Sequence, residues 1–211
     1  MNYVVSLFTC SPRSLRLRVF ALAYAFLLFP LVLSADTYGD YTYTVSGGKA
    51  TITGYSGPGG TVTIPSTIGS GNYPVTAIGD MAFFWKSSLT SVTIPNSVTH
   101  IGEHAFALCE SLTSVDIPNS VTHIGGSAFS SCASLASVFI PASVTSIGDD
   151  AFTSCASLTS ISVSPSNDDY ASVDGVLLNK ACTELIRCPN AYSGPFTIPN
   201  SVIHIRDGAF G

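Results

Sequence analysis

Charged side chains are scarce in this sequence, because Asp, Glu, Lys and Arg make up only 10% of its 211 residues. Soluble domains usually carry roughly 25%. The sequence also lacks a C-x-x-C pair, a G-x-S-x-G elbow and a glycine-rich phosphate loop, so it offers no motif for zinc, for a serine nucleophile or for a nucleotide. Ser, Thr and Gly take the place of charge, which favours a β-rich extracellular protein with a hydroxyl-rich surface.

Residues 1–35 have the order of parts that is typical of a secretory signal peptide. Arg13, Arg16 and Arg18 precede an apolar run over residues 19–33, and small residues follow it. A membrane-spanning helix needs about 20 apolar residues, more than this run has. We therefore expect secretion or display at the cell surface, with cleavage near Ala35; an uncleaved anchor is the alternative.

Basic residues are few in the rest of the chain. Residues 1–35 hold three of the 8 Lys and Arg residues and none of the 13 Asp and Glu residues, so the mature chain is strongly acidic. Such a chain repels phosphate backbones, and we expect no nucleic-acid partner. It keeps no basic amphipathic helix, so we expect no membrane insertion after signal cleavage.

A 23-residue unit repeats through the middle of the chain. Its three regular copies are LTSVTIPNSVTHIGEHAFALCES (89–111), LTSVDIPNSVTHIGGSAFSSCAS (112–134) and LASVFIPASVTSIGDDAFTSCAS (135–157). Each copy has a leucine, an isoleucine before proline, a valine, an isoleucine before glycine, a phenylalanine after alanine and a cysteine at the same positions. Weaker copies lie at residues 62–83, from residue 158 and at residues 196–210. Repeats of this length indicate a solenoid.

A unit this short cannot bury its own apolar side, so successive units must stack, and each repeated residue becomes part of a buried column. Val92 and Ile94 alternate with hydroxyl residues, as in a strand with one buried face. Such strands in register form a parallel sheet with about 4.8 Å between neighbours. Proline lacks the N–H that a ladder needs, so each strand should end there. Gly102 and its equivalents predict a second turn, through positive φ or close backbone approach.

The pattern L-x-x-V-x-I-P-x-x-V-x-x-I-G-x-x-A-F-x-x-C-x-x resembles the BspA-like (Treponema pallidum-type) leucine-rich repeat of bacterial surface proteins. The resemblance covers residues 60–211, strictly over 89–157. It implies a β-rich leucine-rich-repeat solenoid with one parallel strand per coil and short non-helical or 3-10 segments opposite. It also implies that residues 164–194 hold a hairpin that interrupts the array. Within this stretch Asp174-Gly175 marks a turn, VLL a strand, NKAC a tip and TELIRC the return strand. Cys182 stands where the tip glycine of that hairpin is expected.

The chain divides into three parts by these criteria. They are a signal peptide (1–35), an N-terminal β-hairpin cap (36–60) and the solenoid (61–211). The cap is predicted because YTYTV and KATITGY alternate in polarity around Gly47 and Gly48. The repeat stops after an Ala-Phe pair, so we expect an array truncated at the C-terminus, in a protein that is monomeric or part of a longer chain.

The recurring cysteines raise the question of disulfides. Equivalent side chains in stacked coils point the same way, with Cβ atoms about 5 Å apart where a disulfide prefers about 3.8 Å. Cys109, Cys132 and Cys155 are therefore expected to be free, buried thiols that donate weakly to loop carbonyls. Cys182 and Cys188 either bridge their hairpin or stay free.

Histidines and paired acids are the remaining candidates for chemistry. His100 and His123 share a column with Ser146, which favours exposed polar residues on a turn over metal ligands. The paired acids, which a glycosidase would need, are Asp149-Asp150 and Asp168-Asp169. Neighbouring residues in an extended chain point apart, so neither pair can face one substrate as acid and base. We expect no catalytic residue, no metal and no cofactor, hence no enzyme.

The solvent side of the strands is the candidate binding face. Its positions can vary without disturbing the core, which is why solenoids often bind other macromolecules. Asp116 and Phe139 break the hydroxyl pattern, and an exposed phenylalanine among small polar residues is a plausible anchor. The candidate face consists of Ser91, Thr93, Ser114, Asp116, Ser137, Phe139, Ser160 and Ser162.

These observations favour a secreted or cell-surface, non-catalytic interaction or adhesion module. The resemblance implies an extracellular protein or glycan as its ligand. A structural spacer or stalk of a longer multidomain surface protein is the main alternative, and an accessory repeat domain of an extracellular hydrolase is a further one.

Overall fold

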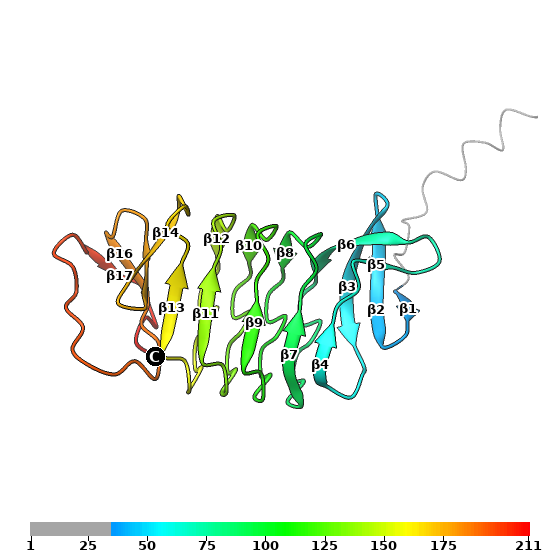
Figure 1. Cartoon of the computed structure of the whole chain (residues 1–211), viewed down its shortest axis with the longest axis horizontal. Coiled ribbons are helices and arrows are strands. Elements are labelled where there is room, and N and C mark those ends of the chain that lie inside the picture. Colours follow the sequence, from blue (N-terminus) through cyan, green and yellow to red (C-terminus); the bar gives the residue numbers. More distant parts are fainter. Residues whose placement is uncertain (1–34) are drawn as a thin grey trace, which may run out of the picture. The chain divides into compact units, whose positions relative to one another are not determined.

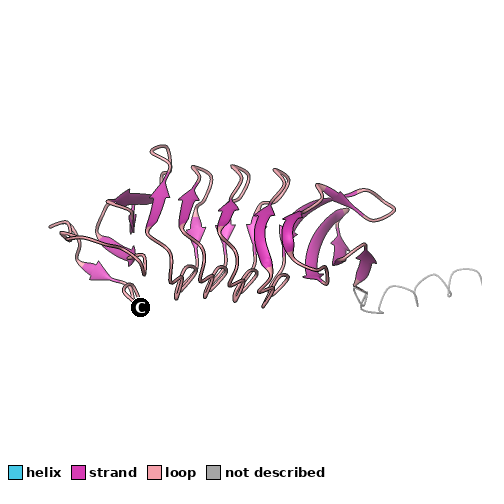
Figure 2. Cartoon of the chain, turned by 60° about the horizontal axis from the view of Figure 1, so that its bottom comes forward, coloured by secondary structure: helices cyan, strands magenta, loops and turns pink. Residues whose placement is uncertain are grey.

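Each repeat forms one coil, and successive coils stack in register along the chain (Figure 1). The structure, a computed structural model, describes residues 35–211. In this part every regular element is a strand (Figure 2), and no helix is long and apolar enough to cross a membrane. The expected signal peptide lies outside the described residues, apart from Ala35.

The first strand of each coil lies where valine and isoleucine alternate with hydroxyl residues. These strands, here called the face strands, are β4 (Gly60–Thr63), β7 (Leu89–Thr93), β9 (Ser114–Asp116), β11 (Ser137–Ile140) and β13 (Ser160–Val163). β4, β7 and β9 pair in parallel, and so do β11 and β13. Residues one repeat apart are register partners, for example Val92 and Val115. This confirms the predicted leucine-rich-repeat solenoid.

Each regular coil also has a second, two-residue strand that the sequence did not predict. These second strands are β8 (His100–Ile101), β10 (His123–Ile124) and β12 (Ser146–Ile147), and they continue in parallel from β6 (Tyr73–Ile78). Two residues are too few to display an alternation, so no periodic signal marks them. The histidine column therefore lies on strands, and its interpretation as part of a turn is wrong.

The repeated apolar positions form buried columns. The phenylalanine column consists of Phe83, Phe106, Phe129 and Phe152, each at most 1% exposed. Successive rings stack nearly parallel, with centroids 4.9, 5.3 and 5.7 Å apart. These separations are close to the spacing of neighbouring strands, so each ring packs directly on the ring of the next coil. Tyr55 extends the column at its start, because its ring lies 5.1 Å from that of Phe83.

The glycine column is required by close backbone approach. A Cβ atom on Gly125 would lie 2.6 Å from the backbone nitrogen of Glu103, and one on Gly148 would lie 2.4 Å from that of Gly126. The sequence analysis gave two possible reasons for these glycines, positive φ and close backbone approach. Neither Gly125 nor Gly148 has a left-handed φ, so close backbone approach is the reason. The left-handed conformation falls two positions later, as at His104 (φ 53°).

The N-terminal region builds a three-stranded start for the sheet of second strands. Its strands are β1 (Asp36–Tyr38), β2 (Tyr41–Ser46) and β3 (Lys49–Tyr55). β2 and β3 pair antiparallel through Gly47 and Gly48, whose φ values are 57° and 74°, and β1 pairs antiparallel with β2. β3 then pairs in parallel with β6, and β6 also pairs antiparallel with β5 (Thr67–Ile68). The first coil is thereby joined to the hairpin by backbone hydrogen bonds.

Residues 164–194 interrupt the repeat with three strands, one more than a hairpin has. The strands of the C-terminal region are β14 (Tyr170–Val173), β15 (Val176–Asn179), β16 (Glu184–Arg187) and β17 (His204–Ile205). β14, β15 and β16 form an antiparallel meander, and β17 pairs in parallel with β16. Cys182, at the expected position of the tip glycine, adopts a φ of 52°. The turn forms without glycine, at a cost of roughly 1–2 kcal/mol for a left-handed residue with a side chain.

Candidate functional site

The eight candidate residues lie in two rows that run across the face strands. One row consists of Ser91, Ser114, Ser137 and Ser160, and the other of Thr93, Asp116, Phe139 and Ser162. The residues of each row are register partners along β7 and β9, and along β11 and β13. Ser91 and Ser160 are half-buried and the other six are exposed. The alternation in the sequence therefore predicted correctly which side of each strand faces solvent.

The two residues that break the hydroxyl pattern lie on neighbouring coils. Asp116 is on β9 and Phe139 on β11, and these strands lie side by side (Figure 1). The two strands nevertheless belong to different sheets, so the ladder of the face is interrupted between them. The Phe139 side chain is 51% exposed. The face thus offers one carboxylate and one large apolar ring among small hydroxyl groups.

Most polar side chains of the face take no part in holding the coils together. Among the residues described, Ser162 is the one member of the set whose side chain hydrogen-bonds to the protein, donating to Val138 O at 3.3 Å. The threonines just outside the rows are structural instead: Thr113 Oγ1 donates to Thr90 O at 3.1 Å. The remaining hydroxyls and the Asp116 carboxylate are consequently available to solvent or to a ligand.

The paired acids do not form an acid–base dyad. The Asp149 side chain is 88% exposed, and its Oδ1 lies 3.6 Å from Nη1 of Arg206. Arg206 also lies 3.2 Å from Glu184, through Nε and Oε1. These ion pairs border an open groove of about 370 Å³, which is lined by Asp149, Asp150, Glu184, His204, Arg206 and Asp207. The sequence did not predict that these residues lie close together, because Glu184 belongs to the interrupting strands, which do not follow the 23-residue register.

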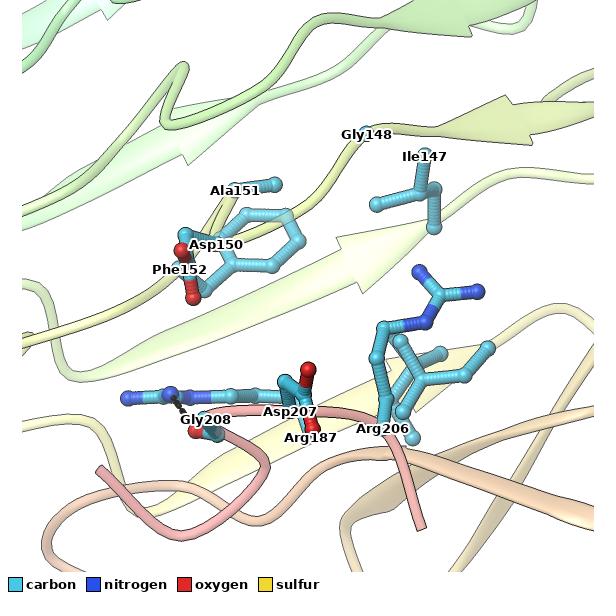
Figure 3. A pocket seen from close by; sticks show the side chains of 11 residues that line it. Ile147, Gly148, Asp150, Ala151, Phe152, Arg187, Arg206, Asp207 and Gly208 are labelled. Carbon is cyan, nitrogen blue, oxygen red and sulfur yellow. Dashed lines mark hydrogen bonds between the residues drawn. The ribbon is translucent and has the colours of Figure 1, made fainter. Parts of the chain in front are cut away.

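Arg187 is a buried cation that the sequence analysis missed. Its hydrogen bonds join residues of the last coils. It lies along one wall of a cavity of about 10 Å³, with Phe152 on the wall opposite (Figure 3). Nη1 donates to Gly208 O at 2.7 Å and to Thr153 Oγ1 at 3.3 Å, and Nη2 donates to Asn190 Oδ1 at 2.6 Å. A cavity of this size accommodates about one water molecule. The arrangement suits a structural anchor and leaves no room for a substrate.

Comparison with known proteins decides the family. The family model for the BspA type leucine rich repeat region matches residues 74–173, in six copies. A leucine-rich repeat protein from Bacteroides capillosus is 36% identical to this chain, covering 62% of it and 99% of its own length, with a TM-score of 0.55. The chain belongs to the BspA-type leucine-rich repeat family. The resemblance drawn from the repeated residues is thereby confirmed.

Two further leucine-rich repeat proteins of known structure are also similar to this chain. The leucine-rich repeat protein TpLRR of T. pallidum is 31% identical, covering 61% of this chain and 71% of its own, with a TM-score of 0.50. A leucine-rich repeat protein from Eubacterium ventriosum is 27% identical, covering 83% of this chain and 56% of its own, with a TM-score of 0.57. The search of curated proteins found no match. The comparisons support a bacterial repeat module of the kind that mediates protein interactions.

The cysteine column of this BspA-type array consists of free, buried thiols, as predicted. Each Sγ donates to the carbonyl of the phenylalanine in the preceding coil. The three bonds join Cys109 to Phe83, Cys132 to Phe106 and Cys155 to Phe129, at 3.2, 3.2 and 3.1 Å. Cys182 and Cys188, for which the sequence left both states open, are free and half-buried.

These thiols predict an alkaline decline in stability. Burial raises the pKa of Cys109 and Cys155 to about 11 and that of Cys132 further, whereas an unfolded thiol has a pKa near 8.5. Between these two pKa values the unfolded chain releases protons that the native chain keeps. The stabilisation by the buried, neutral thiols is therefore complete below the unfolded pKa and is lost as pH rises toward the native pKa. We expect the free energy of unfolding to fall by about 1.4 kcal/mol per pH unit for each thiol above about pH 9.

Urea denaturation between about pH 8 and 10 with a reductant present measures this slope. The matched variant is Cys132→Ala, which lowers stability at every pH and should also flatten the slope by the share of one thiol. A slope that is the same in both proteins would show that Cys132 ionises as readily in the native state as in the unfolded chain.

Proposed function

We propose that this BspA-type solenoid is a secreted or surface-displayed, non-catalytic module that binds an extracellular protein through its face strands. The observation that carries the proposal is Phe139, which is 51% exposed in a row of small polar residues. Burial of such a ring at an interface contributes about 1.5–3 kcal/mol, and large aromatic residues in the middle of a face are the usual anchors of binding. The signal pattern of residues 1–35 supports export.

The chemistry of the face favours a protein ligand. Asp116 gives it one charged contact beside the apolar contact of Phe139, and the unbonded hydroxyls of residues such as Ser114 and Ser137 surround both. An apolar centre with a polar rim is the composition of protein–protein interfaces. Two of the acidic residues that border the groove around Arg206, Asp149 and Glu184, form ion pairs with that arginine, which suits a structural role for them.

The proposal is tested by binding of the exported protein to a panel of purified extracellular-matrix and cell-surface proteins, with a glycan array in parallel. Phe139→Ser is expected to weaken binding to the protein ligand at least about tenfold. The matched control is Met81→Ser, which removes an apolar side chain that is 57% exposed outside the face strands and should leave binding unchanged. Binding to glycans alone, or equal binding by wild type and Phe139→Ser, would overturn the proposal.

A rigid spacer is the second candidate, and the hydrogen bonds between coils favour it. Thr99 N donates to Thr76 O at 2.9 Å and Thr113 N to Thr90 O at 3.0 Å, so two sides of the coil are fixed to the coil before. Phe106 N donates to Ala128 O at 2.8 Å on the remaining side. A protein that serves only as a spacer would bind no member of either panel.

A further inference from the structure

Asp116 is the one charged residue on the face strands, all of which lie in the part of the chain that the structure describes. Its side chain is exposed, and none of the ion pairs found within residues 35–211 involves it. Its register partner on β7 is Thr93, and Phe139 has the same place in the next coil. Aspartate is depleted in strands, so neither coil packing nor strand formation requires a carboxylate at this position.

The carboxylate of Asp116 lies next to the exposed ring of Phe139. The two residues are one repeat apart, and β9 and β11 lie side by side (Figure 1). Just before these strands the coils are joined by a hydrogen bond from Ala136 N to Thr113 O, at 3.4 Å. Both side chains belong to the exposed set of their strand's alternation, so they project from the same side. The face therefore presents an acid and an aromatic ring as one adjacent pair.

A ligand that covers the ring must also deal with the charge. Covering Phe139 removes water from the Asp116 carboxylate beside it, and an ionised carboxylate that is buried without a partner loses far more than burial of one ring gains. The ligand must therefore supply a positive group at this point. The chain outside residues 1–35 is strongly acidic, which attracts cationic ligands and repels anionic ones.

We propose that Asp116 and Phe139 together bind an arginine side chain of the protein ligand. This inference rests on the proposed function, because it concerns the same face. The guanidinium group is planar, stacks on aromatic rings and bonds to a carboxylate through two parallel N–H donors. It is also more weakly hydrated than the ammonium group of lysine, so its transfer to a partly apolar surface costs less. One arginine can thus satisfy the acid and cover the ring at once.

The break in the face sheet adds acceptors at the same place. β9 and β11 belong to different sheets, and no backbone hydrogen bond between described residues joins Ser114–Asp116 to Ser137–Ile140. Carbonyl groups of β9 on this side consequently have no ladder partner. A guanidinium group has five N–H donors, of which the carboxylate takes two. The others are free to donate to such carbonyls, which a lysine with three donors on one nitrogen cannot do with the same geometry.

Selection of random peptides displayed on phage, with the exported protein as the target, tests the proposal without knowledge of the natural ligand. We expect the enriched peptides to share an arginine beside apolar residues, and the same selection on Asp116→Asn to lose that arginine. Enrichment of peptides without arginine, or no enrichment on the wild-type protein, would overturn the proposal.

Calorimetric titration with the most enriched peptide then measures each contact. Asp116→Asn keeps the shape of the side chain and should weaken binding about tenfold, as loss of a hydrogen bond to a charged group does. Phe139→Leu keeps an apolar side chain but removes the ring face, and replacement of the peptide arginine by lysine leaves the charge but removes the plane; each should weaken binding about fivefold. The matched control is Asp168→Asn, which removes an exposed carboxylate outside the face strands and should leave binding unchanged.

The protein ligand from the binding panel separates this inference from the proposed function. Binding that is weakened by Phe139→Ser but equal in wild type and Asp116→Asn would overturn the arginine site and leave the binding face in place. Binding that is unchanged by Phe139→Ser would overturn the face itself. Equal weakening by Asp116→Asn and Asp168→Asn would also count against the site, because only the net charge of the chain would then matter.

Discussion

Replacement of Phe129 by alanine is expected to lower the free energy of unfolding by about 3–5 kcal/mol. Phe129 is fully buried, and its ring packs between those of Phe106 and Phe152, at 5.3 and 5.7 Å. Backbone bonds such as that from Phe129 N to Ala151 O, 2.8 Å long, hold the coils at their spacing. The neighbouring rings therefore cannot close the gap, and the cost of the cavity adds to the lost burial. Urea denaturation measures the change.

Ser137→Ala is the control for this experiment, because it also truncates a side chain in a central coil. Ser137 is exposed on the face strands and its hydroxyl is unbonded, so the variant should stay within about 0.5 kcal/mol of wild type. A loss below about 1 kcal/mol in Phe129→Ala would mean that the phenylalanine column contributes little to stability and that the coils are held by their backbone bonds.

A methyl group on Gly125 is expected to cost about 3 kcal/mol, at the upper end of what overpacking usually does. The added Cβ atom would lie 2.6 Å from both Glu103 N and the carbonyl carbon of Gly102, and 2.7 Å from Gly102 O. All three atoms belong to the backbone of the preceding coil, so no side chain can move aside. The two coils must separate locally, and the bond from Gly125 N to Ile101 O, 2.8 Å long, is strained as they do.

The adjacent glycine provides the control. A Cβ atom on Gly126 would meet only Asp149 O, at 3.4 Å, and its φ lies outside the left-handed region. Gly126→Ala should therefore be neutral, or stabilising by up to about 1 kcal/mol through the lower entropy of the unfolded chain. Thermal unfolding of both variants makes the comparison, and equal effects at the two positions would refute the requirement for close approach.

The core could be predicted from the repeat because the 23-residue period also sets the register between neighbouring coils. Once Phe106 and Phe129 are known to be one repeat apart, stacking of coils dictates that their rings meet. The side of each face strand that is exposed followed from the alternation in the same way. The break in the sheet between β9 and β11 could not be predicted, because the repeated residues do not indicate that the ladder is lost between Asp116 and Phe139.

Features outside the period were the ones that the sequence could not place. Arg187 and Glu184 lie in the interrupting strands, so no repeated neighbour indicates what they contact, and a buried arginine looks like a surface one in sequence. The histidine pair was visible in the sequence as a 23-residue spacing. The hydrogen bond that the preceding Thr99 donates from its hydroxyl to the previous coil was not visible there. Such bonds require coordinates, because they are set by the path of the backbone between columns.

On the regular coils, residues that are one repeat apart are register partners, as in the pairing of Val92 with Val115. Deletion of one complete repeat, such as residues 112–134, would bring two equivalent coils together and restore the same set of contacts. Deletion of a single residue inside a coil would instead misalign every column at that point. Length differences among chains built this way should consequently arise in whole repeats, and gene duplication or loss within the array can change the reach of the molecule without redesigning its core.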